Sequence, residues 1–135
     1  MPLAFLKGET AVGQYLIEGG HKLEGRVRIQ GSKNAVLPMM AAALLQRGTV
    51  ILRHCPRIDD VRCMEEILRY TGARTWWQEE NLFLDCSKIV TGEIPGAYAD
   101  KMRSSVFLLG SLLPRLGSAA VSYPGGCTIG LRPVD

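Results

Sequence analysis

The C-terminal stretch of the chain reads Pro124-Gly125-Gly126-Cys127-Thr128-Ile129-Gly130-Leu131-Arg132-Pro133-Val134-Asp135, and the assignment of the fold depends on it. Its glycines permit backbone angles that a side chain would forbid, so the loop can bring its amides and Cys127 close to a bound ligand. The two prolines stiffen the ends of the loop. A single cysteine, taken alone, is more often a buried, inert thiol in an ordinary surface turn. The whole string, and not the cysteine by itself, therefore carries the interpretation.

Two further motifs precede this loop. The first is Gly31-Ser32-Lys33-Asn34-Ala35-Val36-Leu37-Pro38, and the second is Lys101-Met102-Arg103-Ser104-Ser105. In this order, the three motifs resemble those of the UDP-N-acetylglucosamine enolpyruvyl transferases, which are carboxyvinyltransferases of the EPSP synthase superfamily. The resemblance runs from about Tyr15 to the last residue and covers roughly the first third of a family member.

The resemblance implies an α/β (α+β) fold built from βαβαββ units, the inside-out α/β barrel of the enolpyruvyl transferases, here truncated. Family members have two domains, each with helices inside and sheets outside. Residues 1–30 would then be N-terminal strands that belong in the family to the second domain. Residues 31–135 would form an incomplete first catalytic domain of about one and a half βαβαββ units, without the C-terminal part of the chain.

The order of elements agrees with such units. Alternating apolar and polar residues predict strands at 15–18, 25–30, 49–53, 73–78, 82–86 and 119–122, with a hairpin turn at 79–81. A first helix is predicted at 39–45, with Pro38 in its first turn and Lys33 and Asn34 at the helix entrance. A second is predicted from Val61, Met64, Leu68 and Thr71, preceded by Asp59 and Asp60 and ended by Gly72. A third follows the face Met102, Val106, Leu109 and Leu113 and ends at Gly117.

Length and composition indicate a globular domain that binds small molecules. The chain has 135 residues, of which 47% are hydrophobic and 21% charged, and a formal net charge of +3. This charge is too small and too scattered to indicate a nucleic-acid surface, whereas anionic small molecules remain plausible partners. No apolar run is long enough for a membrane span, and residues 1–10 lack the pattern of a signal peptide. We expect a cytoplasmic location.

The cysteine spacing argues against a zinc site. Cys55, Cys63, Cys86 and Cys127 form no Cys-x-x-Cys pair, and nothing suggests export, so we expect four free thiols. His54 beside Cys55 could be read as a base next to a nucleophile. Adjacent residues of a strand point to opposite faces, however, so we do not favour that interpretation. Trp76 and Trp77 are interpreted as packing in the hairpin and not as a ligand platform.

The resemblance assigns substrate-binding roles to seven residues. Lys33 and Asn34 would contact phosphoenolpyruvate, and Arg103 and Arg132 would lie in the region of phosphoenolpyruvate and the nucleotide sugar. The stretch Pro133, Val134 and Asp135 would touch the nucleotide. The chemistry is suitable, because both substrates are polyanions, and lysine, helix N-termini and paired arginine donors bind phosphate and carboxylate groups. Without the resemblance, Lys33 would be a solvated lysine, Asn34 a helix cap, and both arginines surface or ion-paired groups.

The resemblance makes Cys127 the catalytic residue. Carboxyvinyl transfer by addition and elimination needs a proton at the methylene carbon of phosphoenolpyruvate while the sugar hydroxyl attacks the neighbouring carbon, and a thiol can supply that proton. Cations nearby, such as Lys33 and Arg132, would favour its thiolate form.

The implied function is transfer of the enolpyruvyl group from phosphoenolpyruvate to UDP-N-acetylglucosamine with release of phosphate, the first committed step of peptidoglycan synthesis. No cofactor and no metal are implied. The related shikimate-phosphate enolpyruvyl transferases lack the cysteine loop, so Cys127 argues against that activity. A further alternative is a non-catalytic remnant that binds nucleotide sugar weakly or does not fold independently. We expect the 135-residue chain by itself to be inactive.

Overall fold

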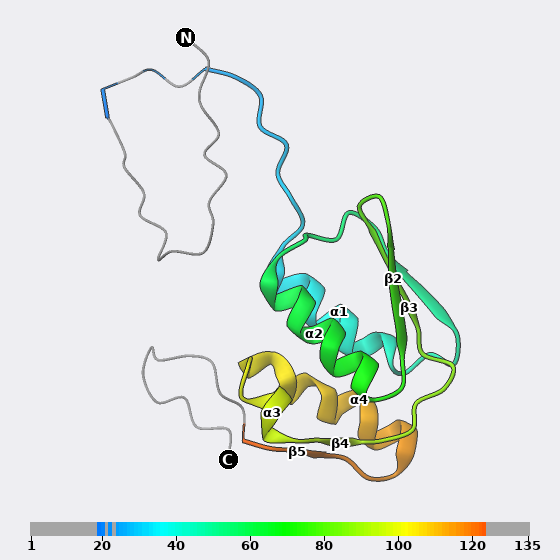
Figure 1. Ribbon diagram of the computed structural model, residues 1–135. Coiled ribbons are helices and arrows are strands. Elements are labelled where there is room, and N and C mark those ends of the chain that lie inside the picture. Colours follow the sequence, from blue (N-terminus) through cyan, green and yellow to red (C-terminus); the bar gives the residue numbers. More distant parts are fainter. Residues whose placement is uncertain (1–18, 21, 23, 124–135) are drawn as a thin grey trace.

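The computed structural model describes residues 19–123 of the chain except 21 and 23. The strand expected at 15–18 and the whole loop at 124–135 lie outside the described residues. The elements follow one another as mixed α and β structure, which confirms the expected α/β class (Figure 1). Among the described residues, no helix combines the length and the apolar character needed to cross a membrane.

A three-stranded antiparallel sheet forms one layer. Its strands are β1 (Thr49–Leu52), β2 (Arg74–Gln78) and β3 (Asn81–Asp85), in the order β1-β3-β2. β2 and β3 form the expected hairpin, in which Gln78 pairs with Asn81, so the loop is Glu79–Glu80 alone. Glu79 adopts a positive φ of 51°, as tight hairpin loops require. Trp76 stacks on Phe83 of the neighbouring strand at 5.2 Å between ring centroids, which confirms its role in hairpin packing.

Helices cover one face of this sheet (Figure 1). They are α1 (Lys33–Ala43) and α2 (Asp59–Tyr70), and α1 also packs against α4 (Phe107–Leu116). The core between them consists of fully buried aliphatic side chains: Leu37, Met40, Leu44, Val61, Met64, Ile67, Leu68, Leu82, Leu84, Leu108 and Leu112. Arg115 of α4 donates to the carbonyl oxygens of Leu44 and Cys86, so it ties the end of α1 to the end of β3.

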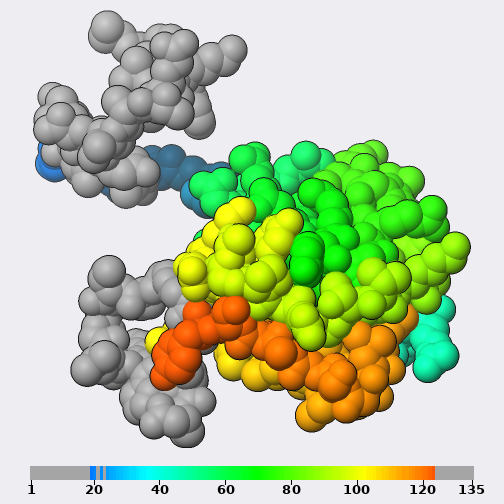
Figure 2. Space-filling model, turned by 60° about the horizontal axis from the view of Figure 1, so that its bottom comes forward, coloured from blue at the N-terminus to red at the C-terminus, as the bar shows by residue number. Residues whose placement is uncertain are grey.

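A second, smaller group of elements leads towards the C-terminal loop. β4 (Glu93–Ile94) pairs in parallel with β5 (Ala120–Val121). Between them lie the short helix α3 (Gly96–Ala99), the 3-10 turn η1 (Arg103–Val106) and α4. Figure 2 shows β5, coloured red-orange, on the surface beside these elements. The chain thus begins a second strand–helix–strand unit, as the order of elements predicted.

The prediction for α1 was wrong in its first residues. The helix begins at Lys33 and not near Met39, so Pro38 lies inside it and not in its first turn. The helix tolerates this proline because its buried residues, among them Leu37 and Met40, continue on one face through Pro38. The missing N–H leaves only the carbonyl of Asn34 without its usual donor, in an exposed first turn where water can bind.

Two other expectations were also wrong. On α4 the buried side chains are Leu108, Ser111 and Leu112, whereas Leu109 and Leu113 of the predicted face are 36% and 53% exposed. This helix is apolar on more than one side, so the spacing of its leucines did not determine which side is buried. Residues 25–30 form no strand in the part of the chain that the structure describes, and Val27 and Ile29 are 88% and 90% exposed. A strand exists only where a neighbouring strand satisfies its backbone, and no described segment pairs with residues 25–30.

Candidate functional site

The start of α1 is held against the loop that follows β1. Gly31 lies so close to that loop that an added Cβ would be 2.7 Å from the carbonyl oxygen of His54 and 3.1 Å from a ring carbon of Pro56. Only glycine fits this approach without a shift of the backbone. Close packing against the loop after β1 therefore requires glycine at this position of the first motif. It fixes where the chain turns into the helix that carries Lys33 and Asn34.

Lys33 and Asn34 are the first two residues of α1, whereas the sequence predicted them just before the helix, at its entrance. Ser32 is the N-cap, and its carbonyl oxygen accepts hydrogen bonds from the amides of Ala35 and Val36. The first amides of a helix have no acceptor within the helix, and they carry a partial positive charge that favours anions. Both side chains are exposed. The exposed start of α1 thus combines a lysine, an asparagine and a helix N-terminus, a set suited to phosphate or carboxylate.

The ammonium of Lys33 is not solvated on all sides. Its Nζ lies 2.8 Å from Oδ1 of Asp60, the second residue of α2. The side chains of Lys33 and Asp60 are 51% and 36% exposed, so the pair sits at the surface with room for a third group. The sequence placed Asp60 at a helix N-terminus but gave no sign of this contact, which depends on how α1 and α2 pack.

Arg103 is the first residue of η1, immediately before α4, and its side chain is partly buried. Met102, the residue before it, is buried in the core and fixes the chain at this point. Lys101 of the same motif pairs with Glu66 of α2 at 2.9 Å, which raises the pKa of Lys101 and lowers that of Glu66. The ammonium of Lys101 is thus engaged with α2, and Arg103 lies at the point where the chain enters α4.

The remaining predicted site residues lie outside the part of the chain that the structure describes: Cys127, Arg132, Pro133, Val134 and Asp135. The described segment that leads to them is β5, which is fixed by its parallel pairing with β4. The structure therefore places Lys33, Asn34 and Arg103 on packed elements and carries the chain towards the cysteine loop.

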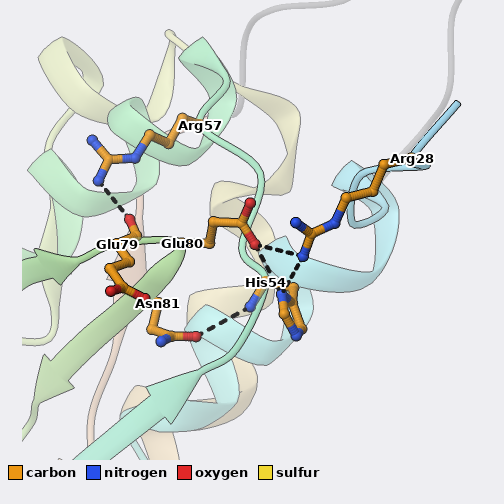
Figure 3. Close-up of polar contacts among 6 residues, drawn as sticks. All are labelled: Arg28, His54, Arg57, Glu79, Glu80 and Asn81. Carbon is orange, nitrogen blue, oxygen red and sulfur yellow. Dashed lines mark hydrogen bonds and ion pairs between the residues drawn. The ribbon is translucent and has the colours of Figure 1, made fainter.

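A second polar cluster, which the sequence did not predict, is formed by Arg28, His54 and Glu80 (Figure 3). Oε2 of Glu80 lies 3.0 Å from both Nη2 of Arg28 and Nδ1 of His54. These contacts lower the pKa of Glu80, the hydrogen bond from His54 most strongly. The cluster borders a hollow of about 590 Å³ next to Gly31. No sequence signal could have found it, because it joins three segments that are distant along the chain.

The same cluster gives the ring of His54 a partner other than Cys55. The ring of His54 is engaged with Glu80, and its backbone takes a positive φ of 50°. Cys55 is buried, and burial, followed by the charge of Glu65, raises the pKa of its thiol to about 11. A thiol with a raised pKa is a poor nucleophile at neutral pH. Cys55, Cys63 and Cys86 all carry free thiols, in agreement with the expectation for these three.

Comparison with known proteins places these features in one family. The family model for EPSP synthase (3-phosphoshikimate 1-carboxyvinyltransferase) matches residues 17–135. A solved structure, the enolpyruvyl transferase NikO from Streptomyces tendae, superposes with a TM-score of 0.67 and 31% sequence identity, covering 75% of this chain and 24% of that one.

Curated relatives are more similar in sequence. A UDP-N-acetylglucosamine 1-carboxyvinyltransferase from Dichelobacter nodosus is 47% identical over 90% of this chain, and one from Thermotoga maritima is 46% identical over 92%. A protein named UDP-N-acetylglucosamine 1-carboxyvinyltransferase 2, from Caldanaerobacter subterraneus, is 40% identical over 92%. The chain spans only 29% to 30% of the length of these relatives.

Proposed function

Because the chain belongs to the EPSP synthase family of enolpyruvyl transferases, we propose that it is the N-terminal part of a UDP-N-acetylglucosamine carboxyvinyltransferase. Such an enzyme transfers the enolpyruvyl group of phosphoenolpyruvate to UDP-N-acetylglucosamine and releases phosphate, at the start of peptidoglycan synthesis in the cytoplasm. The observation that carries the proposal is the identity of 40% to 47% to relatives of that name over at least nine tenths of the chain.

The proposed mechanism gives each site residue one task. Lys33 and Asn34, with the amides at the start of α1, bind phosphoenolpyruvate, and Arg103 and Arg132 bind anionic oxygens of the two substrates. The stretch 133–135 contacts the nucleotide. Each charge-assisted hydrogen bond of this kind contributes about 1.5–3 kcal/mol to binding. The exposed position of Lys33 at a helix N-terminus supports its part in this scheme.

Cys127 is the proposed general acid. It protonates the methylene carbon of phosphoenolpyruvate while the sugar hydroxyl, which loses its proton, adds to the neighbouring carbon. Loss of phosphate together with one proton of the new methyl group then restores the double bond, and both protons pass to a base in the site or to water. The presence of Cys127 within its glycine-rich loop favours UDP-N-acetylglucosamine over shikimate phosphate as the acceptor, because the shikimate-phosphate enzymes lack this loop.

We propose further that residues 31–135 are an incomplete catalytic domain and that residues 1–30 belong with a second domain. Two features support this division. The first is that Val27 and Ile29 alternate with polar residues as in a half-buried strand, yet both side chains are exposed. The second is a groove of about 470 Å³ between α1 and α4, lined in part by the exposed apolar side chains of Leu45 and Phe107. Both features suit surfaces that further polypeptide covers. The 135-residue chain alone is then inactive, and a non-catalytic remnant that binds nucleotide sugar is the alternative.

The test uses the chain in two forms, by itself and completed with the C-terminal remainder of the Dichelobacter nodosus relative. Phosphate release from phosphoenolpyruvate that depends on UDP-N-acetylglucosamine is measured for both. We expect turnover only in the completed chain. Turnover by the 135-residue chain above its Cys127→Ala variant would contradict the proposed incompleteness, and a completed chain that used shikimate 3-phosphate in preference would contradict the proposed acceptor.

Three variants of the completed chain test the role of Cys127. We expect Cys127→Asp to keep measurable turnover, and Cys127→Ser and Cys127→Ala to lose nearly all of it. A carboxylic acid in a partly buried site can donate a proton near neutral pH, whereas an alcohol is far too weak an acid. Similarity of size would predict the reverse order. A serine variant as active as the aspartate variant would remove Cys127 from the role of proton donor.

A further inference from the structure

The ion pair between Lys33 and Asp60 joins the first turns of two helices. We infer that Asp60 is a positioning residue, which holds the ammonium of Lys33 where it can contact phosphoenolpyruvate. The inference rests on the proposed function, in which Lys33 binds that substrate. The contact on which it depends is the 2.8 Å separation between Nζ of Lys33 and Oδ1 of Asp60.

Lysine needs such a partner if its position is to be defined. Its four-carbon side chain loses much rotational freedom when the ammonium is fixed, and without a partner that cost falls entirely on substrate binding. The ion pair with Asp60 already holds Nζ in the free protein, so less rotational freedom is lost when the substrate binds. An ammonium has three N–H donors. One directed at Asp60 leaves two for the oxygens of a phosphate or carboxylate.

Asp60 is itself firmly held. It lies in the first turn of α2, where the helix dipole stabilises its negative charge. The residues that follow, Val61 and Met64, are fully buried, so the start of α2 is anchored in the core. The carboxylate is thus a fixed point against which a flexible lysine is placed, and the pair stays exposed enough for a ligand to reach it.

Asp59 provides a matched control in the same turn. It has the same charge and the same helix dipole, but it pairs with Arg62 of its own helix, at 3.4 Å. Any effect of a first-turn carboxylate on helix stability or on the local potential is common to Asp59 and Asp60. Of these two aspartates, Asp60 pairs with Lys33 and Asp59 with Arg62.

The experiment compares Asp60→Asn, Asp60→Glu and Asp59→Asn in the chain completed with the C-terminal remainder of the Dichelobacter nodosus relative. We expect Asp60→Asn to raise the KM for phosphoenolpyruvate about fivefold, the size of effect typical of one hydrogen bond. The kcat and the KM for UDP-N-acetylglucosamine should change less than about twofold, as should every parameter of Asp59→Asn. Asp60→Glu, which keeps the charge, should recover part of the loss. The thermal midpoint should stay unchanged, because a half-exposed ion pair contributes little to stability.

A double-mutant cycle with Lys33→Ala then separates positioning from a general charge effect. In the Lys33→Ala background, Asp60→Asn should have no further effect on the KM for phosphoenolpyruvate. An undiminished effect in that background would overturn the inference, as would an equal effect of Asp59→Asn. If Lys33→Ala raises this KM and Asp60→Asn does not, the inference fails while the proposed role of Lys33 stands. If Lys33→Ala itself has no effect, both fail.

Discussion

Asp85 shows how a single carboxylate can link strands of the sheet. It lies at the end of β3, opposite Thr49 of β1 and Arg74 of β2, and its side chain accepts hydrogen bonds from the guanidinium of Arg74. Oδ1 also accepts a hydrogen bond from the amide of Ser87. The bonds from Arg74, followed by those from Ser87, lower the pKa of Asp85 to about 2. The charged form is therefore the one that the folded state stabilises.

This shift predicts a loss of stability in acid. A carboxyl group whose pKa is lower in the folded than in the unfolded state stabilises the fold above its unfolded pKa, and the contribution disappears as the pH falls through the folded value. For Asp85 the decline should lie between about pH 4, the unfolded value, and about pH 2. The urea unfolding midpoint of the chain should fall across this interval. The Asp85→Asn variant should be less stable at pH 7, and its unfolding midpoint should depend less on pH below pH 4. Parallel curves for the parent and the variant would contradict the assignment.

For single residues, the sequence predicted local position in the chain better than contacts with other residues. Lys33 and Asn34 were placed at the entrance of a helix, and they are its first two residues. Asp60 and Glu80 were not recognised, since their contacts with Lys33 and Arg28 join segments that meet only through tertiary packing. The loop with Cys127 is the strongest sequence signal, but its role is assigned by resemblance and the loop lies outside the described residues.

Among the elements, α1 is the one that conflicts most with local propensity. Pro38 interrupts its hydrogen bonds, yet the helix runs from Lys33 to Ala43 because Leu37, Met40 and Ala41 are buried against α2 and α4. Helix stability in proteins comes mainly from packing of an apolar face. The sequence predicted the proline in the first turn of the helix, since a proline deeper within a helix is costly by itself.

Replacing this proline should therefore stabilise the domain. Pro38→Ala restores an N–H that can bond to the carbonyl of Asn34, at the expense of a more flexible unfolded chain. We expect a net gain of about 1–2 kcal/mol in the free energy of unfolding, measured by urea denaturation. Pro56→Ala, in the loop after β1, is the control of opposite sign, since it loosens the unfolded chain and restores no helical bond. A loss of stability in Pro38→Ala would mean that packing of its ring outweighs the hydrogen bond.

The other elements differ in how well their sequence pattern predicts their position and buried face. α2 has a single apolar stripe and polar residues elsewhere, and both its position and its buried face agree with the sequence. α4 has apolar residues on several sides, so its buried face could not be read from spacing. β4 and α3 were missed because they are only two and four residues long, too short for a periodic pattern.

At the scale of the whole molecule, the described residues form a well-buried apolar core but also leave a group of apolar side chains exposed on the surface. The sheet and helices bury aliphatic side chains such as Met64, Ile67 and Leu84 completely. Just after α1 and on α4, however, apolar side chains including Leu45 and Leu113 remain exposed, and Leu45 borders the groove between these helices. Contiguous exposed apolar surface usually marks an interface or a site of association. We expect further polypeptide to cover this surface in the proposed complete enzyme.

The 135-residue chain should therefore self-associate through α1 and α4 when it is concentrated. The double variant Leu45→Lys and Leu113→Lys should sediment as a monomer under conditions in which the parent chain forms larger species, because two charges at an apolar interface are costly to bury. Its unfolding midpoint should change little, since both side chains are largely exposed in the monomer. Val90→Lys, an equally polar change at an exposed residue outside the helices, should leave the sedimentation profile of the parent intact. If the parent is already monomeric at high concentration, or if Val90→Lys disperses it as well, the exposed face of α1 and α4 is not the surface that associates.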